Sequence, residues 1–152
     1  MKRIRVIVAA VLALVGLTVS APTASATAGV PATTFTLLTP LPTHLAVGET
    51  AVIGVHVESS EPFLMAIALS DAYYPGRGVS FNGSSAQPGG TAADLFLTVT
   101  GRASTSDLAA VEDWPADEDW AAGVAPLAVR VGARFAGGGV ASASFLFGVV
   151  VA

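Results

Sequence analysis

Apolar and polar residues alternate along most of this chain, and this two-residue period constrains its fold more than any other feature. A period of two places successive side chains on opposite faces of a β-strand, whereas a helix requires a period near 3.6. Gly, Pro, Asn and Asp clusters separate the alternating segments, and no segment after residue 26 is typical of a three-turn helix. Seven strands are therefore predicted, at residues 33–38, 50–58, 63–69, 79–81, 91–100, 126–135 and 140–151.

The same alternation predicts which side chains lie inside. Antiparallel sheets commonly keep one face dry and the other in water, so one-sided alternation favours an antiparallel β-sandwich. Arg130 and Arg134 alternate with apolar residues and are expected to face solvent. The predicted core consists of apolar residues that share one face of their strands: Ile53, Val55, Val57, Met65, Ile67, Leu95, Leu97, Val99, Leu127, Val129, Val131 and Phe147.

The first 26 residues have the three parts of a secretory signal peptide. A lysine and two arginines within the first five residues give a positive start, residues 6–19 carry no charge, and Ala24-Ser25-Ala26 is an A-x-A cleavage pattern. The uncharged segment is shorter than the roughly 20 residues of a membrane-spanning helix. The expected organisation is a signal-peptide helix at 1–26, a mobile leader at 27–32, and one secreted domain at 33–152, free in the medium or associated with the cell envelope.

Charge and cysteine content exclude several classes of function. The chain contains no cysteine, so it has neither a disulfide framework nor the cysteine that lipoprotein anchoring requires. Removal of residues 1–26 leaves four arginines, no lysine and eleven acidic residues, a net charge of 4 − 11 = −7. Nucleic acids and anionic lipids are bound by clustered basic side chains. We therefore expect no nucleic-acid partner and no membrane association after signal cleavage.

Parts of the sequence resemble bacterial immunoglobulin-like domains. Residues 45–50, Leu-Ala-Val-Gly-Glu-Thr, followed by an alternating strand, are similar to the region between the first two strands of such domains. Residues 127–131 and 145–149 are similar to their closing hairpin. The resemblance extends over most of the domain and implies an immunoglobulin-like antiparallel sandwich, although the Cys–Trp–Cys core of antibody domains is missing.

The loop at residues 71–78 is the first candidate binding site. It holds Tyr73, Tyr74 and Arg77, and these side chains provide contact area and hydrogen bonds at low entropic cost. The alternative is that one tyrosine packs against the end of the sandwich while Pro75-Gly76 turns the chain. Adjacent strand residues point to opposite faces, so both tyrosines can share one surface only if the chain bends there.

Residues 112–120, here called the acidic loop, hold five acidic residues and both tryptophans. Three interpretations remain open. Trp114 and Trp120 are candidate ligand-binding residues that could stack on sugar rings. The carboxylates could instead bind calcium, although they lack the spacing of the known calcium loops. Finally, the loop could be a solvated acidic segment whose tryptophans cover the edge of the sandwich.

Catalysis is not expected from this sequence. His44 and His56 are its two histidines, and neither a G-x-S-x-G nor an S-x-x-K motif is present. Two isolated histidines do not form a zinc cluster. We therefore expect a non-enzymatic domain without catalytic residues, resident metal or cofactor. It is expected to bind an extracellular protein, a polysaccharide or a small ligand through loops at one end of the sandwich. A structural module of the cell envelope or spore coat is the alternative, and a calcium-binding module is a third.

Overall fold

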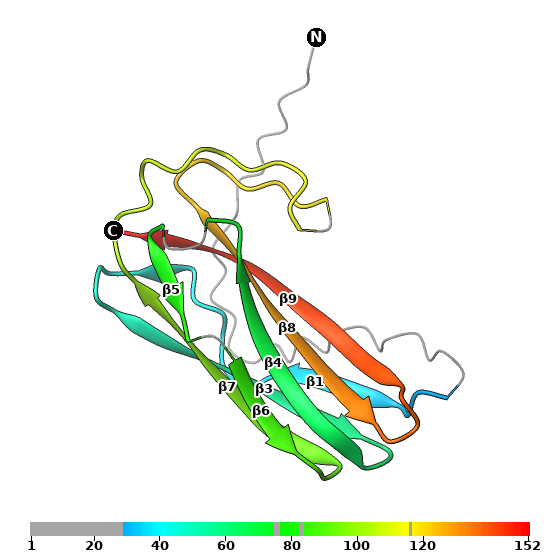
Figure 1. The fold of residues 1–152 in the computed structure, drawn as a ribbon. Coiled ribbons are helices and arrows are strands. Elements are labelled where there is room, and N and C mark those ends of the chain that lie inside the picture. Colours follow the sequence, from blue (N-terminus) through cyan, green and yellow to red (C-terminus); the bar gives the residue numbers. More distant parts are fainter. Residues whose placement is uncertain (1–28, 75–76, 83, 116) are drawn as a thin grey trace.

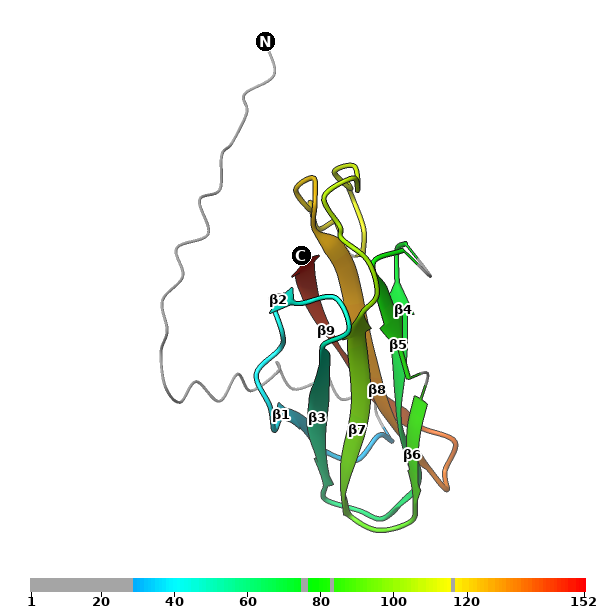
Figure 2. The same cartoon turned by 90° about the vertical axis from the view of Figure 1, so that its left-hand side faces the viewer.

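A computed structural model describes residues 29–74, 77–82, 84–115 and 117–152, so the predicted signal peptide lies outside the described residues. Within these ranges the fold is all-β, and no helix is long and apolar enough to cross a membrane. Two sheets pack face to face (Figure 2). The strands are β1 (Thr33–Leu37), β2 (His44–Leu45), β3 (Thr50–Ser59), β4 (Phe63–Ala72), β5 (Val79–Phe81), β6 (Ser84–Pro88), β7 (Ala92–Gly101), β8 (Ala125–Phe135) and β9 (Val140–Val151).

The strand order divides the chain into a four-stranded and a five-stranded sheet (Figure 1). The four-stranded sheet has the order β1-β3-β7-β5, and the five-stranded sheet has the order β2-β9-β8-β4-β6. Neighbours pair antiparallel, except that β2 pairs with β9 in parallel. β5 and β6 are consecutive in the chain but belong to opposite sheets, so the chain crosses from one sheet to the other between them.

The described residues thus form nine strands where about seven were predicted. The additional strands are β2, which has two residues, and β6, which lies in a stretch predicted to be turns. β6 has the sequence Ser-Ser-Ala-Gln-Pro and is an edge strand that pairs with β4. Ala86, Gln87 and Pro88 are exposed, so this edge strand needs no apolar face and alternation could not predict it.

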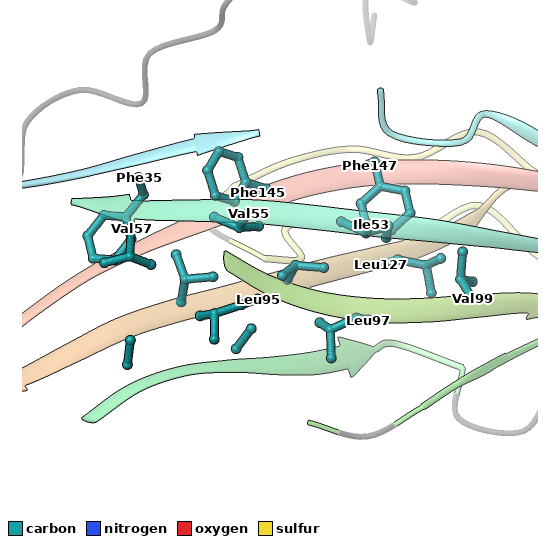
Figure 3. Close-up of a cluster of buried hydrophobic side chains, with 14 of the residues drawn as sticks. Phe35, Ile53, Val55, Val57, Leu95, Leu97, Val99, Leu127, Phe145 and Phe147 are labelled. Atoms are coloured by element: carbon teal, nitrogen blue, oxygen red, sulfur yellow. The ribbon is translucent and has the colours of Figure 1, made fainter. Parts of the chain in front are cut away.

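A single hydrophobic core lies between the two sheets (Figure 3). Ten of the twelve predicted core residues are buried in it, with at most 5 % of their surface exposed. Arg130 and Arg134 are exposed as expected. The structure adds aromatic residues to the core, among them Phe35, Phe63 and Phe145. The alternation along β3, β7 and β8 therefore predicted the inner faces of these strands correctly.

The predicted inner face of β4 is wrong. Met65 is 45 % exposed and Ile67 is partly exposed, whereas Ala66 and Ala68 are buried. The pairing of β4 with β8 shifts between Phe63 and Met65. This β-bulge leaves Phe63 inside but reverses the faces of the residues that follow. The larger apolar side chains of β4 consequently lie on the outer face of the five-stranded sheet.

Candidate functional site

The connection from β7 to β8, residues 102–124, is fixed to one end of the sandwich (Figure 1). Thr105, which is fully buried, is its main anchor. The Thr105 hydroxyl donates to the Gly123 carbonyl oxygen over 2.6 Å and accepts from the Val151 N–H over 3.0 Å. Because this buried hydroxyl both donates and accepts a hydrogen bond, it joins residues near both ends of the connection to β9.

The acidic loop folds back on itself within this connection. Val111 and Trp120 exchange two backbone hydrogen bonds of 2.9 and 2.7 Å, and the Trp114 N–H donates to the Glu118 carbonyl oxygen over 3.0 Å. The Trp120 indole N–H donates to the Trp114 carbonyl oxygen over 2.6 Å. These bonds hold Pro115 at the tip of a narrow, internally bonded loop.

Trp120 lies over Gly148 on the outer face of β9. A Cβ atom at residue 148 would lie 2.8 Å from Cζ3 of Trp120 and would also collide with Val124. Pro126 and Ala128 point toward the same outer face of β8 and are nevertheless buried. The connection therefore covers this end of the five-stranded sheet, and the absence of a side chain at residue 148 makes room for the indole.

The two predicted loops meet at an aromatic cluster formed by Tyr73, Tyr74 and Trp114. The rings of Tyr73 and Tyr74 are 4.8 Å apart at 88°, and those of Tyr73 and Trp114 are 5.4 Å apart at 64°. Both contacts are edge-to-face arrangements, which aromatic quadrupoles favour. The chain bends directly after β4, so both tyrosines lie at the same end of the sandwich.

The members of the aromatic cluster differ in burial. Tyr73 is 45 % exposed and Trp114 is partly exposed. Tyr74 packs against the core, and its hydroxyl donates to the Ala109 carbonyl oxygen over 3.2 Å. Tyr73 is therefore the most exposed of the three, while Tyr74 and Trp114 are both partly exposed and Tyr74 also contacts the core.

The other two predicted site residues have different positions. Trp120 is partly exposed and holds the acidic loop against the sheet. Arg77 is exposed, and its backbone N–H donates to the Tyr74 carbonyl oxygen over 3.1 Å. Among the described residues, no ring contact joins Arg77 to the aromatic cluster. Pro75 and Gly76, predicted to turn the chain, lie outside the described residues.

The acidic residues of the loop are exposed, and Asp119 Oδ1 accepts a hydrogen bond from the Asp113 N–H over 3.2 Å. Glu112, Asp113, Asp117, Glu118 and Asp119 are all exposed. Asp113 and Asp117 have positive φ angles of 59° and 63°, a conformation that aspartate tolerates better than most residues. Within the described part of the chain, no three His, Asp or Glu side chains gather in a group that could hold a metal ion.

A hollow of about 590 Å³ opens beneath the tip of the acidic loop on the outer face of the five-stranded sheet. In its wall, Arg130 Nη2 lies 2.9 Å from Asp71 Oδ2. Its lining comes from the loop tip, β8 and β9: Pro115, Ala128, Arg130, Ser142, Ala143, Ser144 and Leu146.

This hollow could not be predicted from the sequence, although the pattern of β8 and β9 indicated part of its wall. Arg130 was predicted to face outward, and Ser144 is its direct cross-strand partner. Alternation along β9 places Ser142, Ser144 and Leu146 on the same outer face. The missing information was that a loop inserted between β7 and β8 would cover part of that face.

No protein-family model matches this sequence, and comparison with curated proteins finds no match either. The geometry at this end of the sandwich is therefore the basis for a functional assignment.

A second polar pair lies on the other sheet. His56 Nδ1 is 2.6 Å from Asp94 Oδ1 on the outer face of β3 and β7. This pair lies on the four-stranded sheet, whereas the hollow lies on the five-stranded sheet. The aromatic end thus combines exposed rings, a polar–apolar hollow and a rigidly bonded loop, which are features of a binding surface.

Proposed function

We propose that this protein is a secreted, non-enzymatic binding domain that engages an extracellular protein or glycan through the aromatic loops at one end of a β-sandwich. The observation that carries the proposal is the contact between Tyr73 and Trp114. Two separate loops bring these rings together, and both rings keep part of their surface in solvent. Aromatic side chains that keep part of their surface in solvent can supply contact area to a partner.

Rigidity around the rings supports the same proposal. The Trp120 indole bonds the backbone of Trp114, and the Tyr74 hydroxyl bonds the backbone of Ala109. Exposed aromatic residues that are already ordered lose little conformational entropy when a partner binds. Residues of this kind commonly provide most of the binding free energy of an interface.

Strand order supports an immunoglobulin-like fold for the domain. The order β1-β3-β7-β5 corresponds to strands A, B, E and D of an immunoglobulin sandwich, and β9-β8-β4-β6 corresponds to G, F, C and C′. One difference is chain order, because β5 in the D position precedes β6 in the C′ position. Loops at the ends of such sandwiches are where binding residues usually lie.

Secretion is supported by the signal-peptide pattern of residues 1–26. N-terminal sequencing of the protein from the culture medium is expected to begin at Thr27. A chain that retains Met1, or that stays in the cytoplasm, would contradict this part of the proposal.

Binding through the aromatic loops can be measured with labelled protein titrated onto cell-envelope material and onto the macromolecules of the medium. We expect saturable binding that falls at least about tenfold in the double variant Tyr73→Ala/Trp114→Ala, because loss of a central aromatic contact commonly costs about 2 kcal/mol. Phe96→Ala is the matched control, since Phe96 is an exposed aromatic residue of β7 in the opposite sheet.

Two results would contradict the proposal. One is saturable binding that the double variant leaves unchanged. The other is retention in insoluble envelope without saturable binding, which would favour a structural module instead.

A further inference from the structure

The outer face of the five-stranded sheet changes in chemistry along its length. At the loop end, the connection from β7 to β8 covers Pro126 and Ala128. Farther from this end of the sheet, Leu69 of β4, Arg130 of β8 and Ser144 of β9 are cross-strand neighbours. The hollow lies here, over β8 and β9, and Pro115 of the loop tip forms one of its edges.

The polar lining of the hollow includes paired donors and acceptors. Arg130 lines the hollow, and its ion pair with Asp71, which lies outside the lining, orients the guanidinium group. Ser142 and Ser144 are exposed on the neighbouring strand, and each hydroxyl both donates and accepts. A ligand group that also donates and accepts, such as a hydroxyl, is therefore complementary to every polar group here.

The remaining lining is apolar. Leu146 and Ala128 face each other across β9 and β8, and Pro115 stands above them. An apolar strip beside polar groups fits a molecule with hydroxyls at its edge and C–H groups on its face. The volume of about 590 Å³ is within the range of about 300–1,000 Å³ found for small-molecule sites.

We propose that this hollow binds a neutral sugar unit of a glycan, with the hydroxyls at Arg130 and the two serines, and the ring face against Leu146 and Pro115. This inference rests on the proposed binding function and names its ligand class. Trp114 directly precedes Pro115, so a glycan that fills the hollow can continue onto the exposed rings of Trp114 and Tyr73.

Charge favours a neutral glycan over an anionic one. Arg130 is the cationic residue that lines the hollow, and Asp71 already balances its charge. The five exposed carboxylates of the acidic loop lie in the chain on either side of Pro115, and the chain after residue 26 has a net charge of −7 from four arginines and eleven acids. An anionic ligand would approach against this field.

The test uses protein purified after expression of the full chain, with backbone amide chemical shifts followed by NMR. Oligosaccharides of glucose, mannose and N-acetylglucosamine are the neutral probes, and an oligogalacturonate is the anionic probe. We expect saturable shifts at Arg130, Ser142, Ser144 and Leu146 with at least one neutral probe, and weaker binding of the anionic probe.

Variants locate the site. Ser144→Trp fills the hollow from an exposed strand position that tolerates an aromatic residue, and it is expected to weaken the neutral probe at least about tenfold. Arg130→Ala is expected to weaken the same probe. Arg134→Ala is the matched control, because Arg134 is exposed on the same outer face of β8 as Arg130, farther along the strand. The affinity of Arg134→Ala for the same probe is expected to stay within about twofold of that of the unchanged protein, because Arg134 does not line the hollow.

Three results would overturn the inference: no saturable shift with any neutral probe at millimolar concentration, tighter binding of the anionic probe, or neutral binding that Ser144→Trp leaves unchanged. Each can be separated from failure of the proposed function. If Tyr73→Ala/Trp114→Ala abolishes capture of an envelope or medium component while the hollow binds no neutral sugar, the binding function stands and the ligand class is wrong.

Discussion

The indole of Trp120 occupies the space that a side chain at residue 148 would fill. A Cβ atom on Gly148 would lie 2.8 Å from one ring atom of Trp120 and 2.9 Å from another. The carbonyl oxygen of Trp114, which borders the aromatic cluster, accepts the hydrogen bond from this same indole. The position of Trp114 therefore depends on a glycine in a strand that carries neither tryptophan.

Substitution of this glycine is expected to displace the loop. Gly148→Ala should lower the free energy of unfolding by about 1–3 kcal/mol, because the added methyl group overlaps both Val124 and the Trp120 ring. Urea denaturation measures the stability, and acrylamide quenching should rise as the tryptophans become more exposed. The control is Gly137→Ala, where a Cβ atom meets nothing within 4 Å. Equal effects of the two substitutions would show that Trp120 does not rest on this site.

A second prediction concerns the anchor of the connection. Thr105→Val keeps the shape of the side chain but removes the hydroxyl that bonds Gly123 and Val151. The free energy of unfolding should fall by about 1–3 kcal/mol, since buried backbone groups lose their partner. Thermal or urea unfolding reports the change, and Thr34→Val on the exposed face of β1 should be nearly neutral. A neutral Thr105→Val would mean that water reaches these groups.

The bulge in β4 makes opposite predictions for neighbouring residues. Ala66→Leu should destabilise the domain by about 1–3 kcal/mol, because Ala66 is fully buried between the sheets. Met65→Gln should change stability by less than about 0.5 kcal/mol, because Met65 is 45 % exposed. Urea midpoints at constant slope compare the two. The reverse order of effects would place Met65 inside and refute the bulge.

The core itself is tested by a buried charge. Val129→Asp is expected to unfold the domain, because Val129 is fully buried and the carboxylate would have no partner there. Far-ultraviolet circular dichroism and NMR dispersion distinguish folded from unfolded protein. Val52→Asp is the control, since Val52 lies on a strand but is 49 % exposed. A folded Val129→Asp variant with native dispersion would contradict the assigned core.

Local alternation predicts faces only while the backbone keeps a strict period of two. β3, β7 and β8 keep it, so Ile53, Leu97 and Val129 were placed correctly. In β4 a single irregularity after Phe63 reverses every later face. The apolar pattern could not reveal this reversal. Met65 and Ile67 are typical of a buried strand face, whereas Ala66 and Ala68, which are the buried residues, are compatible with either face.

The candidate site was predictable in its parts but not in its assembly. Tyr73 and Trp114 stand out from a background of Ala, Gly, Ser and Thr, so both were identified from the sequence. Their contact depends on a loop that crosses the outer face of the sheet, and the contacts that guide it are long-range. The hollow around Arg130 was missed for the same reason, since its lining residues look like an ordinary wet strand face until the loop tip is placed above them.

The parallel pairing of β2 with β9 has a consequence for the time course of folding. Leu45 accepts a hydrogen bond from the Ala152 N–H, and the Thr43 carbonyl oxygen accepts one from the Val150 N–H. A ribosome delivers residues 43–45 more than a hundred residues before their partners, so this part of the sheet has nothing to pair with until synthesis reaches residue 152. Contacts so distant in sequence close slowly, because the intervening chain must first lose its conformational freedom. The domain therefore completes its core only after its last strand, β9, has been made.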